Sequence, residues 1–149
     1  MKTVEIYTDG ATSNNGYEGA RGGWAFIIVE NGSIIHKGKG YMENATNNQC
    51  ELAAIISACH AARELEETVT IYSDSAYCIN CYEQQWYKKW ERNGWINSKN
   101  EPVANQDLWK KLIPFFEDPH FIFKKVKGHS DNEFNNIVDR MAVEARCLI

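Results

Sequence analysis

Two aspartates follow nearly identical segments of this chain, and their carboxylates could act together in one reaction. An apolar, β-like run leads into Asp9 in the phrase IYTDGA and into Asp74 in the phrase IYSDSA. Either aspartate alone could be a cap at the end of a strand, because aspartate is common at turns. If the two strands are parallel neighbours, however, both carboxylates lie at the same end of the sheet, where ligands bind in open α/β folds. The repeated phrase therefore predicts two halves of one site.

Two further acids interrupt apolar helical patterns. Glu51 lies in the first turn of an expected helix, between Cys50 and Leu52, where an acid can also complement the helix dipole. Asp139 follows an apolar pair in the last expected helix, one position off an apolar stripe that it could simply border. Four carboxylates that converge on one point repel one another unless they are protonated or neutralised by a metal ion.

The chemistry of this set of acids is that of a hard-cation site. Oxygen-only ligands favour Mg²⁺ or Mn²⁺ and select against zinc. Two such ions about 3.5–4 Å apart can hold the attacking and leaving oxygens of a phosphate during in-line displacement. The four acids therefore predict phosphodiester hydrolysis. A zinc site is not expected, because the pair Cys78 and Cys81 has no second pair of ligands at a suitable spacing.

The hydrophobic periodicity predicts the elements that position these acids. A strand is expected at 3–8, followed by a hairpin around Asn31-Gly32, a pair that favours a type I′ turn. The segment TNNQCELAAIISACHAARELEE then has the helical period, with Thr46 or Asn47 as its cap. The next strand, TVTIYSD, follows a helix and is therefore expected to lie parallel to the first strand.

The second half of the chain is expected to be mainly helical. Residues 75–117 look helical, with interruptions at 93–94 and at 100–102, and FIFKKVK forms a last strand. A capping box of Ser130 and Glu133 precedes the final amphipathic helix. This order of elements predicts an α/β domain with a mixed sheet.

The composition is that of an ordinary soluble protein with an uneven charge distribution. The 149 residues carry a net charge of −4 and are expected to form one domain. The segment from Trp86 to Lys127 has a net charge of +4, whereas the remainder has −8, so a local basic footprint lies on an acidic body. No apolar run reaches the roughly 18 residues of a membrane-spanning helix, and the first residues do not resemble a signal peptide. A cytoplasmic protein without membrane contact is expected.

Four segments of the chain, in order, resemble the segments that carry the metal site of type 1 ribonuclease H. They are YTDGA, TNNQCELAAI, YSDSAY and VKGHSDNEFNNIVDRMA. The resemblance covers essentially the whole chain and implies an α/β ribonuclease H-like fold, with a five-stranded mixed sheet of three antiparallel and then two parallel strands flanked by helices. It implies one domain over 1–149, with a basic handle at about 83–105. It implies Asp9, Glu51, Asp74 and Asp139 as the metal ligands.

The resemblance also implies the reaction. The chain would hydrolyse the RNA strand of RNA·DNA hybrids with two Mg²⁺ ions, or Mn²⁺ in their place, leaving 5′-phosphate and 3′-hydroxyl ends. His129, in KGHS, would shuttle protons or help product release. The partner would be the hybrid duplex, and the chain is expected to act as a monomer without an obligate protein partner.

Further residues are implied as contacts to the substrate. Asn47 and Asn48 would contact RNA 2′-hydroxyls and base edges, and the 2′-hydroxyl is the group that distinguishes the strand to be cut. The resemblance also implies a pocket for a phosphate of the DNA strand, and in this pocket Asn44 stands where some relatives carry an arginine. Trp90 and Trp109 are expected to pack in the core rather than contact the substrate. The remaining implied contacts are Asn14, Asn15 and Gly16 in a glycine-rich loop, Gln49 beside the helix start unless it faces solvent, Trp86, Lys88, Lys89, Arg92, Ser98 and Lys99 in the handle, and Thr46 and Asn105 in the pocket.

Three alternatives remain open from the sequence. A related sheet-based nuclease is one, although proofreading exonucleases carry Asp-x-Glu on the first strand and Asp9-Gly10-Ala11 lacks the second acid. A non-catalytic hybrid-binding module would normally have lost at least one of the four carboxylates. A sugar-kinase-like or actin-like phosphate binder would need two such domains and a longer chain.

Overall fold

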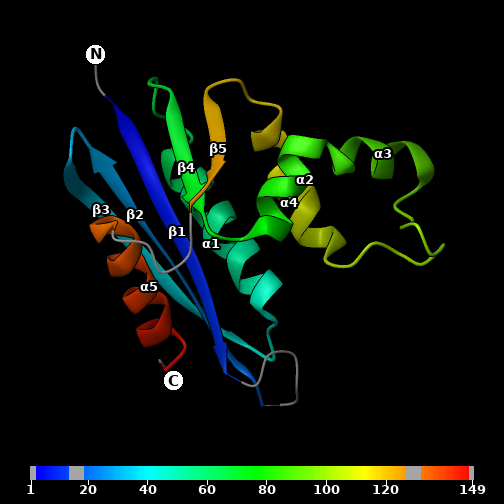
Figure 1. Cartoon of the computed structure of the whole chain (residues 1–149), viewed down its shortest axis with the longest axis horizontal. Coiled ribbons are helices and arrows are strands. Elements are labelled where there is room, and N and C mark those ends of the chain that lie inside the picture. Colours follow the sequence, from blue (N-terminus) through cyan, green and yellow to red (C-terminus); the bar gives the residue numbers. More distant parts are fainter. Residues whose placement is uncertain (1–2, 14–18, 127–131, 148–149) are drawn as a thin grey trace.

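The structure is a computed structural model of the chain, and it describes residues 3–13, 19–126 and 132–147. Its strands are β1 (Val4–Ser13), β2 (Arg21–Glu30), β3 (Ser33–Glu43), β4 (Val69–Ser73) and β5 (Phe121–Lys125). They form one sheet in the order β3-β2-β1-β4-β5, as Figure 1 shows. The first three strands pair antiparallel, β4 pairs parallel to β1, and β5 pairs parallel to β4. The mixed five-stranded sheet expected from the sequence is confirmed.

The hairpin between β2 and β3 turns at the expected pair. Asn31 has φ 49° and Gly32 has φ 84°. Two central residues with positive φ are what a type I′ turn requires, and its twist matches that of the flanking strands.

Strand β1 is longer than predicted, and Asp9 lies inside it rather than at its end. The antiparallel ladder with β2 continues past Asp9, which faces Ala25, as far as Ser13. The parallel ladder with β4 stops at Tyr7 opposite Tyr72. Asp9 therefore lies just beyond the point where β4 ends. The strand predicted at 3–8 is therefore too short at its end, because the ladder with β2 includes Gly10 as a strand residue.

The described residues form five helices, and most of them pack on the two faces of the sheet. They are α1 (Asn47–Ala62), α2 (Ala76–Gln84), α3 (Trp86–Asn93), α4 (Gln106–Phe116) and α5 (Glu133–Ala145). Of the helices in the described residues, α5 is the one that covers the first face, where Val138 and Ala142 pack against Tyr7 and Ile27. The other helices lie on the opposite side in Figure 1, and the larger core there includes Ile6, Ile71, Leu52 and Leu112. Burial of apolar surface on both faces fixes where α1 and α5 can lie relative to β1.

The helical second half is interrupted at more points than predicted. Gly94, with φ 80°, ends α3, as expected from the sequence. An additional break falls at Gln85, whose left-handed φ of 58° separates α2 from α3. Helix α5 begins later than the predicted capping box, because Asn132 is the N-cap and accepts a hydrogen bond from the Asn135 N–H at 3.0 Å.

The handle, residues 83–105, contains α3 and the loop that follows it, and it extends away from the sheet in Figure 1. Its base is an aromatic cluster. The Trp90 ring contacts those of Trp86, Trp95 and Trp109, at centroid distances of 6.4, 5.7 and 5.7 Å. Trp109 is fully buried. The packing role expected for Trp90 and Trp109 is confirmed.

Candidate active site

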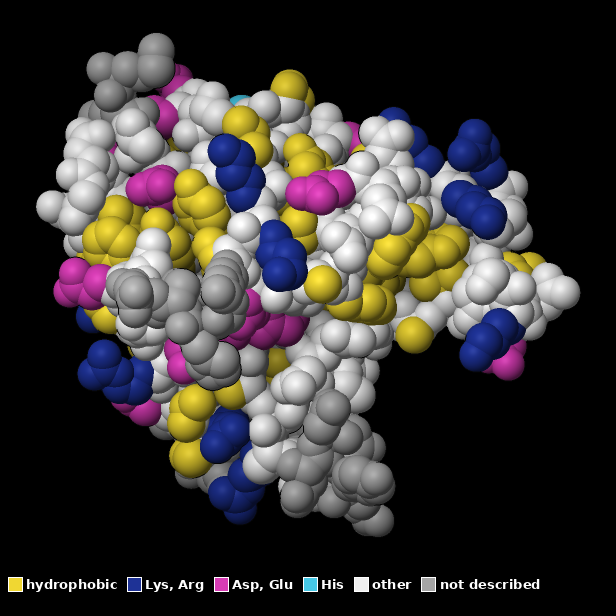
Figure 2. All heavy atoms as spheres, viewed as in Figure 1, with side chains coloured by type: hydrophobic (Ala, Val, Ile, Leu, Met, Phe, Trp, Pro, Cys, Tyr) yellow, Lys and Arg dark blue, Asp and Glu magenta, His cyan; other side chains and the backbone are white. Residues whose placement is uncertain are grey.

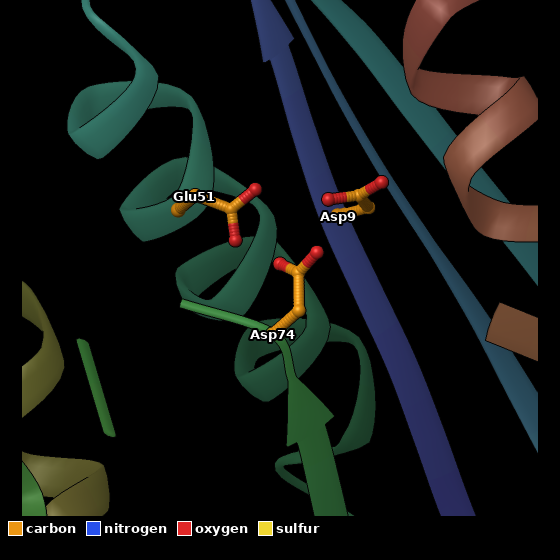
Figure 3. A group of neighbouring side chains, drawn as sticks. All are labelled: Asp9, Glu51 and Asp74. Atoms are coloured by element: carbon orange, nitrogen blue, oxygen red, sulfur yellow. The ribbon is translucent and has the colours of Figure 1, made fainter. Parts of the chain in front are cut away.

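Three carboxylates from distant parts of the chain meet at one point. Asp9 comes from β1, Glu51 from α1 just after its first turn, and Asp74 from the residue after β4. One oxygen atom from each lies within 4.8 Å of the others. Figure 3 shows the three carboxylates facing one another between α1 and the two strands. Asp139, from α5, lines the same cavity of about 390 Å³, so the four predicted acids are brought together.

Gly10 allows Glu51 to reach this point. A Cβ at Gly10 would lie 2.6 Å from both the carbonyl carbon of Cys50 and the backbone nitrogen of Glu51. Real Cβ atoms do not approach backbone so closely, so only glycine lets the first turn of α1 rest directly on β1. The Gly10 N–H then donates to Glu51 Oε1 at 2.6 Å and to Asp9 Oδ1 at 2.9 Å.

Ser73 holds the other oxygen of Glu51. Its hydroxyl donates to Glu51 Oε2 at 3.3 Å and accepts from the Ser75 N–H at 3.1 Å. The sequence interpretation missed both Gly10 and Ser73. A signal for Ser73 was present, because a hydroxyl residue precedes the aspartate in both phrases; in the first phrase Thr8 donates to the Tyr72 carbonyl at 2.9 Å.

The start of α1 is fixed by a capping box. Thr46 is the N-cap, and its hydroxyl accepts from the Gln49 N–H at 3.1 Å while Gln49 Oε1 accepts from the Thr46 N–H at 2.9 Å. Gln49 Nε2 also donates to Asn105 Oδ1 at 3.3 Å. The side chain of Gln49 is thus held within the protein rather than simply facing solvent. Asn47 and Asn48 line the carboxylate cavity, and Asn47 Oδ1 accepts from the Thr12 hydroxyl at 2.7 Å.

Burial and mutual repulsion both disfavour the ionised forms of the carboxylates in this cavity. Burial raises the pKa of Asp9 to about 8, and the nearby Asp139 and Asp74 add to this rise. Burial likewise raises the pKa of Glu51 well above its usual range, helped by the charges of Asp9 and Asp74. Desolvation and like charge both disfavour the ionised carboxylate. A divalent cation would remove this penalty, and a set of carboxylate oxygens suits a hard cation such as Mg²⁺.

Most of the other predicted contact residues lie in the handle. Lys88, Lys89 and Arg92 are exposed on α3, Ser98 and Lys99 are exposed on the loop after it, and Trp86 is half-buried. At the right of Figure 2, dark-blue Lys and Arg side chains lie over this part of the chain. Asn44 Oδ1 accepts from the Gly19 N–H at 2.9 Å, a contact within the protein. The predicted residues Asn14, Asn15, Gly16 and His129 lie outside the described residues.

The sheet topology and the convergent carboxylates define a class of protein: an α/β domain with a carboxylate cluster, suited to a hard cation, at the end of its parallel strand pair. Comparisons with known proteins identify the family. The model of the RNase H family matches residues 1–146. The chain belongs to the RNase H family, and it is a metal-dependent endoribonuclease of that family.

Two relatives illustrate the similarity in sequence. A ribonuclease H from Caldanaerobacter subterraneus subsp. tengcongensis is 46% identical over 141 residues, which cover 95% of this chain and 89% of that protein. A ribonuclease H from Caldicellulosiruptor saccharolyticus is 46% identical over 142 residues, which cover 95% of this chain and 94% of that protein.

Solved structures with the same fold are more distant in sequence. LC9-RNase H1, described as a type 1 RNase H with the type 2 active-site motif, has a TM-score of 0.80 and 24% identity, covering 97% of this chain and 72% of that one. A foamy viral protease-reverse transcriptase in complex with double-stranded DNA has a TM-score of 0.85 and 21% identity, covering 99% of this chain and 96% of that one. At these identities the likeness shows the fold alone. No helix in the described ranges is long and apolar enough to cross a membrane.

Proposed function

We propose that this chain cleaves the RNA strand of RNA·DNA hybrids at the carboxylate cavity with two divalent cations, leaving 5′-phosphate and 3′-hydroxyl ends. Cleavage of RNA in such hybrids is the activity supported by the family. The observation that carries the finer proposal is the meeting of Asp9, Glu51 and Asp74 within 4.8 Å, with Asp139 in the same cavity. When bound, the cations neutralise charge at the phosphate and activate the attacking water.

The residues of the cavity suit this cofactor. All four side chains offer oxygen atoms only, and the raised pKa values of Asp9 and Glu51 signal an uncompensated negative charge. We assign Asp9 to both ions, Glu51 and Asp74 to one, and Asp139 to the other. Mg²⁺ is the expected cation, and Mn²⁺ is compatible with the same oxygen ligands.

The side chains around the cavity would orient the hybrid. Asn47 and Asn48 line the cavity and would meet 2′-hydroxyls and base edges of the RNA strand. Asn14, Asn15 and Gly16 would approach the sugar-phosphate backbone, and His129 would move protons or assist product release. Thr46 and Asn105 would contribute to a DNA-phosphate pocket. Trp86 and Ser98 would line the DNA path along the handle.

We propose further that the chain acts as a monomer in the cytoplasm. All four carboxylates of the cavity come from one copy of the chain, which supports action as a monomer. The relatives described above are bacterial, and bacterial hybrids form in the cytoplasm, where the chromosome lies.

A cleavage assay on matched duplexes tests the proposed reaction. With Mg²⁺ present, we expect the RNA strand of an RNA·DNA hybrid to be cut internally, and double-stranded RNA and double-stranded DNA of the same sequence to stay intact. Labelled ends should identify 5′-phosphate products, and a chelator should stop the reaction. Cleavage of duplex DNA with the hybrid intact would favour a related nuclease instead. Tight hybrid binding without cleavage in either Mg²⁺ or Mn²⁺ would favour a non-catalytic binding module.

The handle supplies a second prediction. Lys88, Lys89 and Arg92 are exposed on α3, and we propose that they bind DNA phosphates. Replacing all three with glutamine should weaken hybrid binding by about tenfold at moderate salt, because each cation that neutralises a phosphate releases counterions from the duplex. The slope of log Kd against log salt should fall by about 0.9 for each phosphate that the variant no longer neutralises. Fluorescence anisotropy over a salt series measures both quantities.

The matched control removes three charges elsewhere. Lys37 and Lys39 lie on β3, and Arg63 follows the end of α1, and all three are exposed. Their triple glutamine variant should lower the net charge equally but keep the wild-type salt slope. If the two triple variants behave alike, the handle acts only through net charge and does not touch the hybrid.

A further inference from the structure

Helices α2 and α4 meet at the hydroxyl of Tyr77, which lines the carboxylate cavity. Tyr77 lies in the first turn of α2, three residues after Asp74. Its hydroxyl oxygen accepts from Trp109 Nε1 at 3.0 Å and from Asn105 Nδ2 at 3.2 Å, so α4 and its N-cap both donate to it. A hydroxyl has two acceptor lone pairs, and these two donors occupy both. Trp109 is fully buried, and the Tyr77 hydroxyl is the partner that its Nε1–H finds there.

Asn105 connects Tyr77 to the helix that carries Glu51. Asn105 occupies the N-cap position of α4 in a left-handed conformation, φ 62°, and its side chain makes no cap hydrogen bond there. Asparagine is among the best N-cap residues, so an unused cap is notable. Its side chain instead bridges two other helices, with Nδ2 donating to Tyr77 and Oδ1 accepting from Gln49 Nε2 at 3.3 Å.

Gln49 connects Asn105 to the N-terminal turn of α1, which lines the carboxylate cavity. It closes the capping box with Thr46 and so fixes the first turn of the helix, where Asn47 and Asn48 line the cavity. The carboxylate of Glu51 has its own supports, because it accepts from the Gly10 N–H and from the Ser73 hydroxyl. The hydrogen-bonded chain from Tyr77 through Asn105 and Gln49 therefore reaches the turn that carries the two asparagines, whereas the Glu51 carboxylate is held by other partners.

We propose that Tyr77 is a positioning residue for the RNA strand: its hydroxyl, through Asn105 and Gln49, sets the position of the first turn of α1 and hence of Asn47 and Asn48. This inference rests on the proposed function, in which those two asparagines contact the RNA. It gives Gln49 and Asn105 an internal role in addition to any contact with nucleic acid.

Tyr77→Phe tests the inference, because it keeps the ring and removes only the hydroxyl. We expect KM for the hybrid to rise by about fivefold, since small displacements of positioning groups weaken substrate binding. The turnover at saturating hybrid and the Mg²⁺ concentration for half-maximal activity should stay within about twofold of wild type. Combined with Gln49→Ala, the effects on KM should not add, because both changes interrupt one hydrogen-bonded chain. Additive effects, or a fall in turnover with unchanged KM, would overturn the proposal.

The matched control is Tyr82→Phe. The ring of Tyr82 packs against Phe116 and Phe123 in the same core, at centroid distances of 5.2 and 4.9 Å. Removal of its hydroxyl should leave KM unchanged. If Tyr77→Phe does not fold, Gln49→Ala must alone reproduce the rise in KM, and an unchanged KM in that variant would reject the inference.

Hydrogen–deuterium exchange of the full chain gives a readout that needs no activity. The amides of residues 47–52 should exchange about tenfold faster in Tyr77→Phe and at the wild-type rate in Tyr82→Phe. If the wild-type protein cuts no hybrid, the proposed function fails while this measurement still decides whether Tyr77 holds α1. If the wild type cuts hybrid but exchange and KM are unchanged in Tyr77→Phe, only the positioning role is rejected.

Discussion

Asp9→Asn is expected to reduce cleavage of the hybrid by at least about a thousandfold in Mg²⁺, because it removes the anionic ligand that we propose is shared by both cations. Asparagine keeps the shape of the side chain, so the fold and the surrounding cavity should persist. Hybrid binding should stay within about threefold of wild type, since phosphate contacts dominate affinity for nucleic acids. Single-turnover cleavage and fluorescence anisotropy on the same duplex separate the two effects.

Asp107→Asn is the matched control for this variant. Asp107 is an exposed acid in the first turn of α4 and does not line the carboxylate cavity. Its replacement changes the net charge by the same amount and should leave cleavage unaffected. Full turnover by Asp9→Asn would remove Asp9 from the site, and an equal loss in both variants would point to net charge as the cause.

The convergence of Asp9, Glu51 and Asp74 could be inferred from the sequence because it depends on local patterns and topology. The two phrases have β-branched, apolar residues before the aspartate, and a helix between two strands implies that the strands are parallel. Glu51 stands out in the sequence because it interrupts the apolar pattern near the start of α1. These signals need only neighbouring residues and a general rule of chain handedness, and for that reason they were sufficient.

The details of the site depend on distances that no local pattern encodes. Gly10 looked like a turn residue, and only the packing of α1 on β1 reveals that its missing Cβ makes room for the helix. The hydroxyl of Ser73 and that of Tyr77 find partners 22 and 28 or more residues away. Hydroxyl groups can bond in many directions, so sequence alone does not select one partner.

The handle illustrates the same limit at larger scale. Its helical period and the break at Gly94 were visible in the sequence, but the break at Gln85 was not. Glutamine rarely adopts a left-handed conformation, so its φ of 58° reflects tertiary packing rather than local preference. The cluster around Trp90 sets the direction of α3 relative to the body.

The metal-free protein should lose stability as the pH rises from about 4 to about 8, a consequence of the buried carboxylates. The pKa of Asp9 is raised from 3.8 to about 8 in the fold, and that of Glu51 is also raised. Over this interval the unfolded chain has already released protons that the folded protein still holds. Stability therefore falls with increasing pH, by up to about 6 kcal/mol for Asp9, because each tenfold change in proton affinity corresponds to about 1.4 kcal/mol.

Asp9→Asn isolates this effect, because asparagine does not ionise and relieves its neighbours of a negative charge. At pH 8 without divalent cations, the variant should be more stable than wild type by several kcal/mol, and the difference should vanish near pH 4. Urea unfolding at several pH values measures both curves. Adding Mg²⁺ at pH 8 should stabilise the wild type more than the variant, because a ligand that binds only the folded state adds its binding free energy to stability. Parallel curves for the two proteins would mean that Asp9 is ordinarily ionised in the fold, and the charge crowding that favours a cation at this cavity would then be absent.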